Sequence, residues 1–304
     1  MSLINKTNGY YGETTTVLNE FEIEEINNPS SKELHINAAI VTDIQELVLQ
    51  IYARDQAHRL TLENSTFSKL NVHRSAINSD HLWLVFKQGK LVAYLSGSHI
   101  YTDFGEQVYV FKACMVADDV NNKAELFSRL YARQIIRGVL SYWNSANNLG
   151  KPMPFITRTL NPSVMQTVYS LGTNMYPGFD DLPINDRIRD RHRAFEKVIN
   201  ESIGDDGILV NSFMKHSDYQ LRPTKGKSLR SKIYSFCRDL GETDGAVLTG
   251  ELVFGDDLIR HLKDKSSHDQ MSMGDLGLVN LLRDSGAKQE QSSFEGFVMG
   301  GYPS

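Results

Sequence analysis

The sequence has 304 residues, of which 40% are hydrophobic and 23% are charged, and its formal net charge is −5 at pH 7. These values are typical of a soluble globular chain that can bury one large core or two smaller ones. They predict neither nucleic-acid binding nor a membrane span, because there is no global basic field and no apolar run near the roughly 20 residues a bilayer requires.

The two cysteines, Cys114 and Cys237, lie far apart in the sequence. This spacing argues against a disulfide scaffold and against a cysteine-based zinc site, so we expect no metal. The first residues lack the basic-then-apolar order of a signal peptide. We therefore expect a cytoplasmic protein.

The first predicted elements follow a polar start. Residues 1–33 are rich in small polar and acidic residues, which predicts a flexible N-terminal arm. Residues 34–41 are predicted to form a short strand, and Thr42 is predicted to cap a helix. The apolar face of that helix repeats at three- and four-residue spacing. It comprises Ile44, Leu47, Val48, Ile51 and Tyr52.

A hairpin and a long strand–helix unit come next, after a short helix predicted at 62–70. Strands at 82–86 and 91–101 flank the compact turn Lys87-Gln88-Gly89-Lys90. The apolar run 108–116 predicts a buried strand, and residues 124–143 an amphipathic helix. A strand that feeds a helix in this way often binds phosphate at the helix N-terminus. An ordinary strand–helix connection without a ligand explains the same pattern.

The remaining elements complete the predicted fold. They are a strand at 155–159, a helix that starts at Asn161-Pro162 and ends at Gly172, helices at 183–199, 228–240 and 256–263, and strands at 207–213 and 245–254. This order predicts an α/β fold of the α+β kind, with a mixed, mostly antiparallel central sheet flanked by helices and a divergent C-terminal extension.

Residues 34–172 carry a resemblance to a known family. The words FITRTLNPSVMQTVYSLG (155–172) and VYVFKACMVADDVNNKAELF (108–127), in this order of elements, resemble the GCN5-related N-acetyltransferase (GNAT) superfamily, of which the chain looks like a divergent member. The resemblance implies a GNAT-like acyltransferase domain at 34–260, with an insertion around 177–240. Residues 261–304 are then a polar C-terminal tail.

The resemblance also implies a coenzyme site. In that family the strand before the long helix splays from its neighbour to admit acetyl-CoA or another acyl-CoA, and backbone N–H groups hold the thioester carbonyl. These groups correspond to Met115 and Val116 here. The pyrophosphate cradle corresponds to the loop and helix start that follow. Its residues are Asn121, Asn122, Lys123, Ala124 and Glu125, with Asn161 as a further coenzyme contact unless it only caps its helix.

This loop departs from the family pattern because it contains no glycine. Glycine lets the backbone approach a phosphate closely. Asparagine tolerates left-handed conformations better than most residues, so Asn121 and Asn122 can keep the turn. Lys123 would offset phosphate charge, whereas Glu125 would oppose it.

The family's catalytic acid is often a tyrosine four residues before the closing glycine of the later helix. Here Tyr169 stands three residues before Gly172, and Val168 occupies the usual place. Asp103 and Glu106 are candidates for the base that deprotonates the amine. The alternatives are a core or surface tyrosine and two solvated turn residues.

Three hypotheses follow. The first is an acyl-CoA-dependent N-acyltransferase whose acceptor is an amine of a small molecule or peptide, and which could form a homodimer. The second is a catalytically degenerate protein of the same fold that acts as a binding or regulatory module. The third is an unrelated α+β fold whose element order matches by chance.

Overall fold

The computed structural model describes residues 6–8, 11, 14–18, 20–121, 123–145, 148, 150–159, 161–178, 184–210, 229–241 and 244–253. The chain divides into two compact units. Unit 1 combines Met1–Ser98 with Phe111–Gly138, and unit 2 combines His99–Val110 with Val139–Ser304. The chain crosses from one unit to the other within strand β5 (Lys90–Tyr101), strand β6 (Gln107–Val116) and helix α4 (Lys123–Asn144). Each unit is described by itself.

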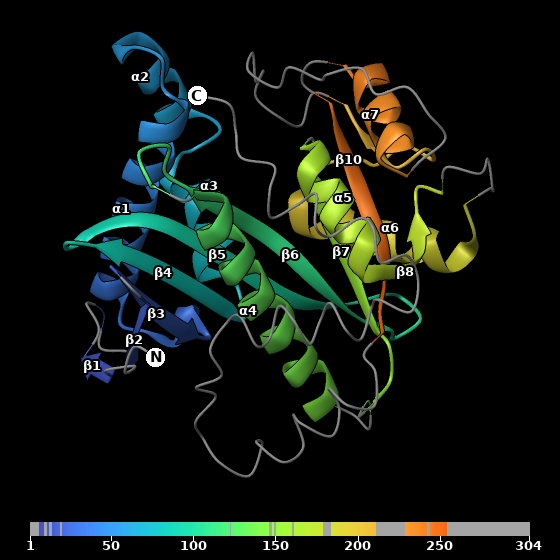
Figure 1. Ribbon diagram of the computed structural model, residues 1–304, viewed down its shortest axis with the longest axis horizontal. Helices are drawn as coiled ribbons and strands as arrows, with labels where there is room; N and C mark the ends of the chain where they lie inside the picture. Colours follow the sequence, from blue (N-terminus) through green and yellow to red (C-terminus); the bar gives the residue numbers. More distant parts are fainter. Residues whose placement is uncertain are drawn as a thin grey trace. The chain divides into compact units, whose positions relative to one another are not determined.

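The strands of unit 1 follow the order β1-β2-β3-β4-β5-β6 (Figure 1). The new strands are β1 (Lys6–Asn8), β2 (Thr14–Leu18), β3 (Phe21–Asn27) and β4 (His81–Lys87). Each of the pairings β1–β2, β2–β3, β3–β4 and β4–β5 is antiparallel. Gln88 and Gly89 both have positive φ, 51° and 78°, so the β4–β5 hairpin turns as the sequence predicts.

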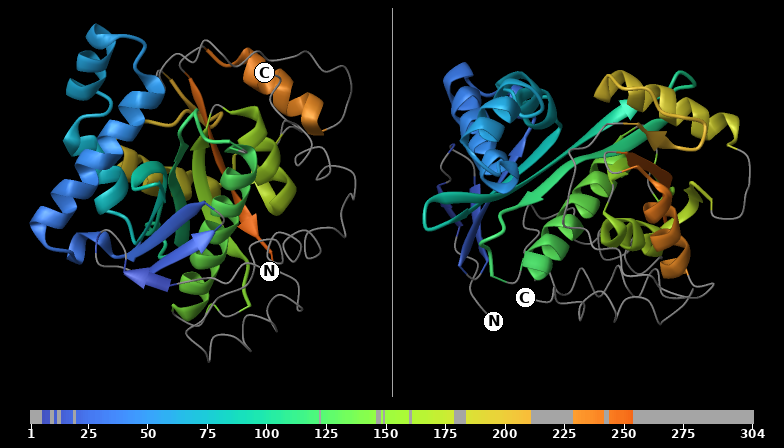
Figure 2. Two further views of the ribbon diagram at one scale, coloured as in Figure 1. Left: turned by 60° about the vertical axis from the view of Figure 1, so that its left-hand side comes forward. Right: turned by 90° about the horizontal axis from the view of Figure 1, so that it is seen from above.

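Helices cover both faces of these strands. The helical segments are η1 (Pro29–Ser31), α1 (Leu34–Tyr52), α2 (Gln56–Asn64), α3 (Lys69–Val72) and the π-helical turn η2 (His73–Ile77). In Figure 2, α1 to α3 lie on one face of the unit 1 strands, and the first part of α4 lies on the other. Ile40, Ile44 and Val48 of α1 are fully buried in one hydrophobic core with Ile23, Ile26 and Trp83 of the strands.

Two predictions for the start of the chain are wrong. Residues 21–27 were assigned to a flexible arm, but they form strand β3, whose Phe21, Ile23 and Ile26 are buried. Residues 34–41 were predicted as a strand, but they are the first half of α1. Thr42 is therefore no cap: its hydroxyl donates to the Ala38 carbonyl inside the helix at 2.9 Å. Ile40 and Val41 are β-branched and so favour a strand locally. Burial of Ile40, Ile44 and Val48 at four-residue spacing instead follows the period of a helix.

Unit 2 is built on the strands β7 (Met153–Thr159), β10 (Gly245–Leu252) and β8 (Gly172–Tyr176), which are neighbours in that order, and β9 (Ile208–Leu209) pairs with β10. The pairings of β10 with β7, β8 and β9 are antiparallel. Its helices are α5 (Pro162–Leu171), α6 (Asp186–Ile199) and α7 (Leu229–Asp239). Phe195 of α6 shares a buried cluster with Val108, Val110, Ile156, Leu209 and Val247.

The predicted helices near 162, 186 and 229 and the strands near 153 and 245 are confirmed. Strand β8 was missed, since it begins at Gly172 directly after α5 with no loop residue between them. The predicted helix at 256–263 and tail at 261–304 lie outside the described residues, as do 211–213 of the predicted strand at 207–213. The predicted class is confirmed: a mixed, mostly antiparallel sheet is flanked by helices. No described helix is long and apolar enough to cross a membrane.

Candidate functional site

The predicted site residues fall in both units. Met115, Val116, Asn121, Lys123 and Ala124 belong to unit 1. Asp103, Glu106, Asn161 and Tyr169 belong to unit 2. Asn122 lies outside the described residues.

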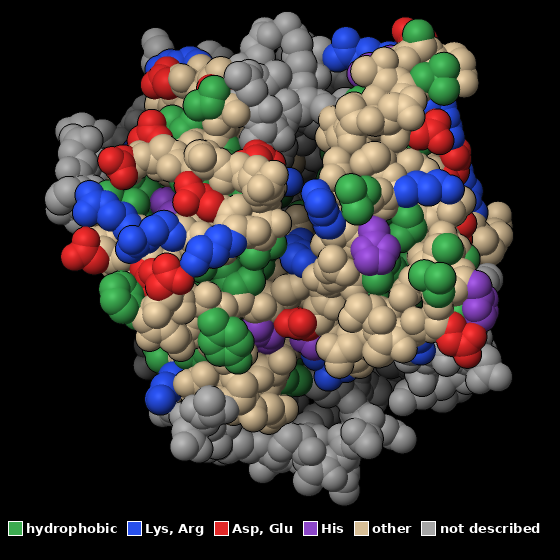
Figure 3. Space-filling model, turned by 180° about the vertical axis from the view of Figure 1, so that it is seen from behind, with side chains coloured by type: hydrophobic (Ala, Val, Ile, Leu, Met, Phe, Trp, Pro, Cys, Tyr) green, Lys and Arg blue, Asp and Glu red, His purple; other side chains and the backbone are tan. Residues whose placement is uncertain are grey.

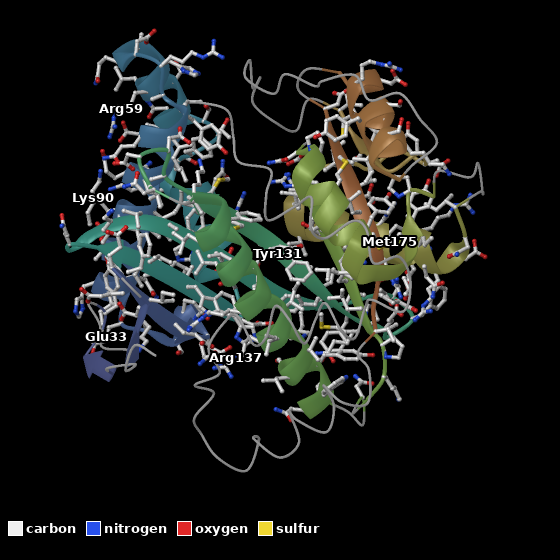
Figure 4. All side chains as sticks on the ribbon, in the orientation of Figure 1. Glu33, Arg59, Lys90, Tyr131, Arg137 and Met175 are labelled. Atoms are coloured by element: carbon white, nitrogen blue, oxygen red, sulfur yellow. The ribbon has the colours of Figure 1, made fainter. Side chains whose placement is uncertain are left out.

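Strand β6 departs from regular alternation just before Met115. Phe111 contacts the α4 side of the sheet, because its ring centroid lies 5.3 Å from that of Tyr131, which is labelled in Figure 4. We infer that Phe111 faces α4.

Lys112 and Met115 face the opposite side. The Lys112 amine donates to the carbonyl oxygen of Asn78, just after η2, and the Met115 sulfur accepts the Tyr52 hydroxyl of α1 at 3.3 Å. In a regular strand, residues four apart point to the same face, whereas Phe111 and Met115 face opposite sides. We infer an irregularity of the β-bulge type between them, and a bulge disrupts the hydrogen-bond ladder locally.

The surroundings of Met115 on the α1 side are neutral and aromatic. The Tyr52 and Phe67 rings are stacked with centroids 5.1 Å apart. The Gln45 side chain donates to the Phe67 carbonyl at 2.8 Å, which fixes the segment that carries this ring. Tyr52, Phe67 and Met115 are each half-buried. The three side chains form an apolar surface beside the strand end.

The loop between β6 and α4 begins in a fixed position, since the Ala117 N–H donates to the Val92 carbonyl at 2.8 Å. Lys123, the expected partner of a phosphate, lies 2.5 Å from the carboxylate of Asp118. Lys90, labelled in Figure 4, lies 3.9 Å from Asp119. Asn121 is an exposed turn residue. A phosphate that reached Lys123 would compete with Asp118 for its amine, and the sequence alone does not reveal this pair.

Cys114 is no reactive nucleophile in this structure. Burial raises the pKa of its thiol far above the ordinary range, and Lys123 offsets this only partly. A thiol rather than a thiolate is then present at neutral pH, and the thiolate is the reactive form.

Glu106 in unit 2 belongs to a cluster of charged side chains. Arg191 Nε lies 2.7 Å from one carboxylate oxygen, and Arg187 Nε lies 2.8 Å from the other. Both arginines also reach Glu251, at 3.2 Å and 2.8 Å, and Asn174 donates to Glu251 at 2.9 Å. We name Glu106, Arg187, Arg191, Glu251 and Asn174 the ion-pair cluster.

This cluster makes Glu106 a poor base. Burial alone would raise the pKa of its carboxyl, but hydrogen bonds from Arg191 and Arg187 outweigh burial, and the pKa lies below its ordinary value. A carboxylate that is stabilised in its ionised form has little tendency to take a proton from an ammonium group. The Glu106 side chain attaches the start of β6 to α6, and the two arginines in turn connect α6 to Glu251 of β10.

Asp103 and its neighbours also attach the β5–β6 loop to α6. Asp103 lies 2.7 Å from Lys197, whose hydrogen bond and charge lower the pKa of the carboxyl. The Phe104 N–H donates to the buried Asp190 carboxylate at 3.3 Å. The loop that carries both base candidates is therefore bound to one helix through Asp103, Phe104 and Glu106.

Tyr169 and Asn161 lie at opposite ends of α5. The Tyr169 hydroxyl donates to the Pro177 carbonyl at 2.5 Å, and burial followed by the influence of Cys237 and Tyr176 raises its pKa. The Asn161 carbonyl accepts the Met165 N–H at 3.0 Å, which starts the helix. The Asn161 N–H donates to the Thr159 hydroxyl at 3.0 Å.

The sequence did not reveal five residues that contact the predicted site residues or their strand. Tyr52, Phe67 and Lys112 lie around the end of β6, and Arg187 and Arg191 bind Glu106. The arginines carried a usable signal, since their spacing of four residues puts both on one face of a helix. Lys112 carried none, because a lone lysine in an apolar strand does not reveal what its amine contacts. Figure 3 shows Lys and Arg side chains interspersed with Asp and Glu over one face of the described residues.

No protein-family model matches the sequence, and no curated protein matches it. Among solved structures, the chain is similar to the loading GNATL domain of CurA from Lyngbya majuscula. The sequences are 11% identical, the TM-score is 0.29, and the match covers 80% of this chain and 100% of that chain. A TM-score this low supports no further conclusion.

Proposed function

We propose that this protein is an acyl-CoA-dependent N-acyltransferase, which moves an acetyl or longer acyl group to an amine of a small molecule or peptide. The observation that supports it best is that Phe111 contacts Tyr131 of α4 while Met115, four residues further along β6, contacts Tyr52 of α1, from which we infer an irregularity of the strand before Met115 and Val116. Element order adds support, because β3, α1, the β4–β5 hairpin, β6, α4, β7 and α5 succeed one another as the resemblance implies.

In this proposal the N–H groups near Met115 and Val116 polarise the thioester carbonyl, as preorganised donors do in other acyl transfers. The first turn of α4, together with Asn121, Asn122, Lys123 and Ala124, attracts the phosphates, for which Asp118 competes at Lys123. The acceptor amine attacks the carbonyl carbon, the C–S bond breaks, and the departing thiolate takes up a proton. The resemblance assigns that proton to Tyr169, whose hydroxyl donates to the Pro177 carbonyl in this structure.

The proposal assigns the deprotonation of the amine to neither Asp103 nor Glu106. Both carboxylates are bound to cationic side chains, and the pKa of each lies below its ordinary value. Transfer of the amine proton to solvent water before attack requires no carboxylate. Holding donor and acceptor in attack geometry then supplies much of the rate.

A second candidate is a binding or regulatory module that keeps the acyl-CoA site without catalysis. The observation that favours it is the state of the proposed reactive groups. Tyr169 donates to a backbone carbonyl, Glu106 is held by two arginines and Asp103 by Lys197. Each would have to exchange a partner before acting.

Two measurements separate these candidates. The melting temperature is followed with acetyl-, octanoyl- and palmitoyl-CoA, because a ligand bound at 100 times its Kd stabilises the fold by about 2.7 kcal/mol. Thiol release is then followed over a panel of amines. A shift with thiol release supports the transferase, a shift without it supports the module, and no shift with any donor rejects both.

A further inference from the structure

Three side chains of unit 1 form an apolar surface next to the end of β6. Tyr52 ends α1, Phe67 lies just before α3, and Met115 belongs to β6. The Tyr52 and Phe67 rings are stacked with centroids 5.1 Å apart, and the Tyr52 hydroxyl donates to the Met115 sulfur at 3.3 Å. All three side chains are half-buried and pack against the same hydrophobic core. Segments far apart in the sequence therefore present apolar groups at one place.

Hydrogen bonds hold this surface in place. Gln45 of α1 is 5% exposed, and its side-chain amide donates to the Phe67 carbonyl at 2.8 Å. The Phe67 N–H donates to the Leu62 carbonyl of α2, also at 2.8 Å. These two bonds fix the backbone that carries the Phe67 ring. A surface that already has its binding conformation loses little conformational entropy when a ligand covers it.

The arrangement of the two rings favours a hydrocarbon over a cation. An ammonium group is attracted to the faces of aromatic rings. The planes of Tyr52 and Phe67 differ by 29°, and each ring directs one face toward the other, so the two rings cannot enclose a cation between them. Ring edges carry the positive part of the aromatic quadrupole, which repels a cation but packs well against methylene groups. The surface therefore suits an alkyl chain better than the ammonium form of an acceptor amine.

Met115 connects this surface to the proposed reaction. The proposed function assigns its backbone N–H, with that of Val116, to the thioester carbonyl, and its side chain contacts Tyr52. In an acyl-CoA the alkyl chain is bonded directly to that carbonyl carbon. A chain that leaves the carbonyl on the α1 side of β6 meets Met115, Tyr52 and Phe67 first. An acetyl group has a single methyl and covers little of this surface.

We propose that the apolar surface of Tyr52, Phe67 and Met115 binds the alkyl chain of the donor, so that the protein uses acyl-CoAs longer than acetyl-CoA. The inference rests on the proposed function for the position of the thioester. Each methylene group that the surface removes fully from water raises the affinity about fourfold. The affinity should therefore rise from acetyl- through butyryl- to hexanoyl-CoA, and level off once the chain extends past the two rings.

The test uses the full chain and titration calorimetry with acetyl-, butyryl-, hexanoyl- and octanoyl-CoA, each below its critical micelle concentration. The quantity compared is the Kd for acetyl-CoA divided by the Kd for hexanoyl-CoA, which we call the chain-length ratio. This ratio does not depend on how much of a variant is folded. For the wild type we expect a ratio of about ten or more, since a half-buried surface covers only part of each methylene.

Variants locate the binding surface. Phe67→Ala and Tyr52→Ala each remove one ring, and each should lower the chain-length ratio by about threefold or more. The two rings come from different segments, so one variant remains informative if the other does not fold. Leu60→Ala is the matched control, because Leu60 of α2 is an apolar side chain that is 50% exposed and has no contact with Met115 in this proposal. Its ratio should equal that of the wild type.

Four outcomes contradict the inference. A wild-type ratio near one, with acetyl-CoA bound, overturns it and leaves the proposed function standing. A high ratio that both ring variants keep in full also overturns it, because the chain then binds elsewhere. If the ring variants raise the KM of the amine and keep the wild-type ratio, the surface holds the acceptor and the inference is wrong. If no acyl-CoA binds, the proposed function fails and the inference with it.

Discussion

Arg191 donates two N–H groups from one edge of its guanidinium to the Glu106 carboxylate: Nε lies 2.7 Å from Oε2, and Nη2 lies 2.8 Å from Oε1. Arg191 is 2% exposed, so this two-point pair is shielded from solvent. Parallel N–H···O contacts of this kind are directional as well as strong. The pair fixes the start of β6 against α6 within unit 2.

Removing one partner of this pair should be costly. Arg191→Met removes the buried partner of the Glu106 carboxylate and leaves Arg187 as its remaining cationic partner, so we expect a loss of about 1–3 kcal/mol in the free energy of unfolding. Urea denaturation measures it. Arg189→Met is the matched control on the same helix, because Arg189 is exposed and pairs with the exposed Asp186, and its cost should stay near 0–1 kcal/mol. Equal losses in the two variants would argue against a structural role for the ion-pair cluster.

Asp118 and Lys123 should shift acyl-CoA affinity in opposite directions. Asp118→Asn removes the carboxylate that competes with phosphate for Lys123, so the Kd should fall by about two- to fivefold, a change of 0.4–1 kcal/mol. Lys123→Ala should raise the Kd by a similar factor. Titration calorimetry at fixed ionic strength gives both values, with Lys87→Ala as a control for loss of a positive charge. Changes of the same sign would remove this loop from the binding site.

Tyr169→Phe distinguishes two roles of the Tyr169 hydroxyl, a catalytic acid or a purely structural hydrogen-bond donor. The lost hydrogen bond to the Pro177 carbonyl is expected to cost about 0.5–1.5 kcal/mol of stability. If Tyr169 also protonates the thiolate, kcat for thiol release should fall by about 10²–10⁴ while acyl-CoA affinity stays unchanged. A variant that loses only stability would show that the hydroxyl holds the chain after β8 and takes no part in transfer.

The sequence allowed the elements with strong periodicity to be predicted. Val108–Val116, the face of α4 and the Asn161-Pro162 helix start are each local signals, and each lies where the pattern put it. Strand β3 was not predicted because its burial depends on pairing with β4, for which a polar stretch such as FEIEEIN offers little local evidence. Non-local pairing decides such a strand.

The candidate site was less predictable, for a related reason. The sequence places Glu106, Tyr169 and Lys123 in the chain but does not reveal which groups bind them. In the folded protein Glu106 binds Arg191, Tyr169 donates to the Pro177 carbonyl, and Lys123 pairs with Asp118. Folding and loop geometry create these contacts. Hydrogen-bond partners decide whether a carboxylate is a base or one half of an ion pair, so the roles of these residues could not be derived from their types.

The buried His192 predicts that the folded protein loses stability in acid over a defined pH range. Its ring is buried against Tyr176, its Nε2 has no hydrogen-bond partner among the described residues, and burial lowers its pKa to about 4 despite the charge of Asp205. The unfolded chain takes up this proton near pH 6.5, so stability falls as the pH drops from about 6.5 to 4, by at most about 3 kcal/mol.

The check compares wild type with His192→Phe, whose side chain does not titrate. The difference between their unfolding free energies should be constant above pH 7 and should shift in favour of the variant below it. His192→Gln repeats the comparison with a smaller side chain in case the larger ring disturbs the packing. Parallel pH curves in both comparisons would mean that His192 is solvated in the folded protein.

Ile26 tests whether the N-terminal strand belongs to the core. It is fully buried and pairs with Leu82, so Ile26→Ala should cost about 2–5 kcal/mol of unfolding free energy. The half-buried Glu22 on the same strand provides the control, and Glu22→Ala should stay within about 0.5 kcal/mol. If Ile26→Ala were as mild as the control, the strand would contribute little to the core.

The pairing of β3 with β4 sets an order on folding. Every contact between these strands spans the whole segment that holds α1, α2, α3 and η2. Closing that loop lowers the conformational entropy of the chain before the strand pairing stabilises the fold. Such contacts therefore form more slowly than local ones. Until β4 is in place, the edge of β3 opposite β2 has no partner and Phe21, Ile23 and Ile26 are not covered, and open strand edges of this kind associate with one another. Strand β10 stands in the same relation to β7 in unit 2. In each unit, the strand pairing with the largest sequence separation, β3–β4 or β7–β10, is therefore expected to form late. Misfolding is most to be expected at these two pairings.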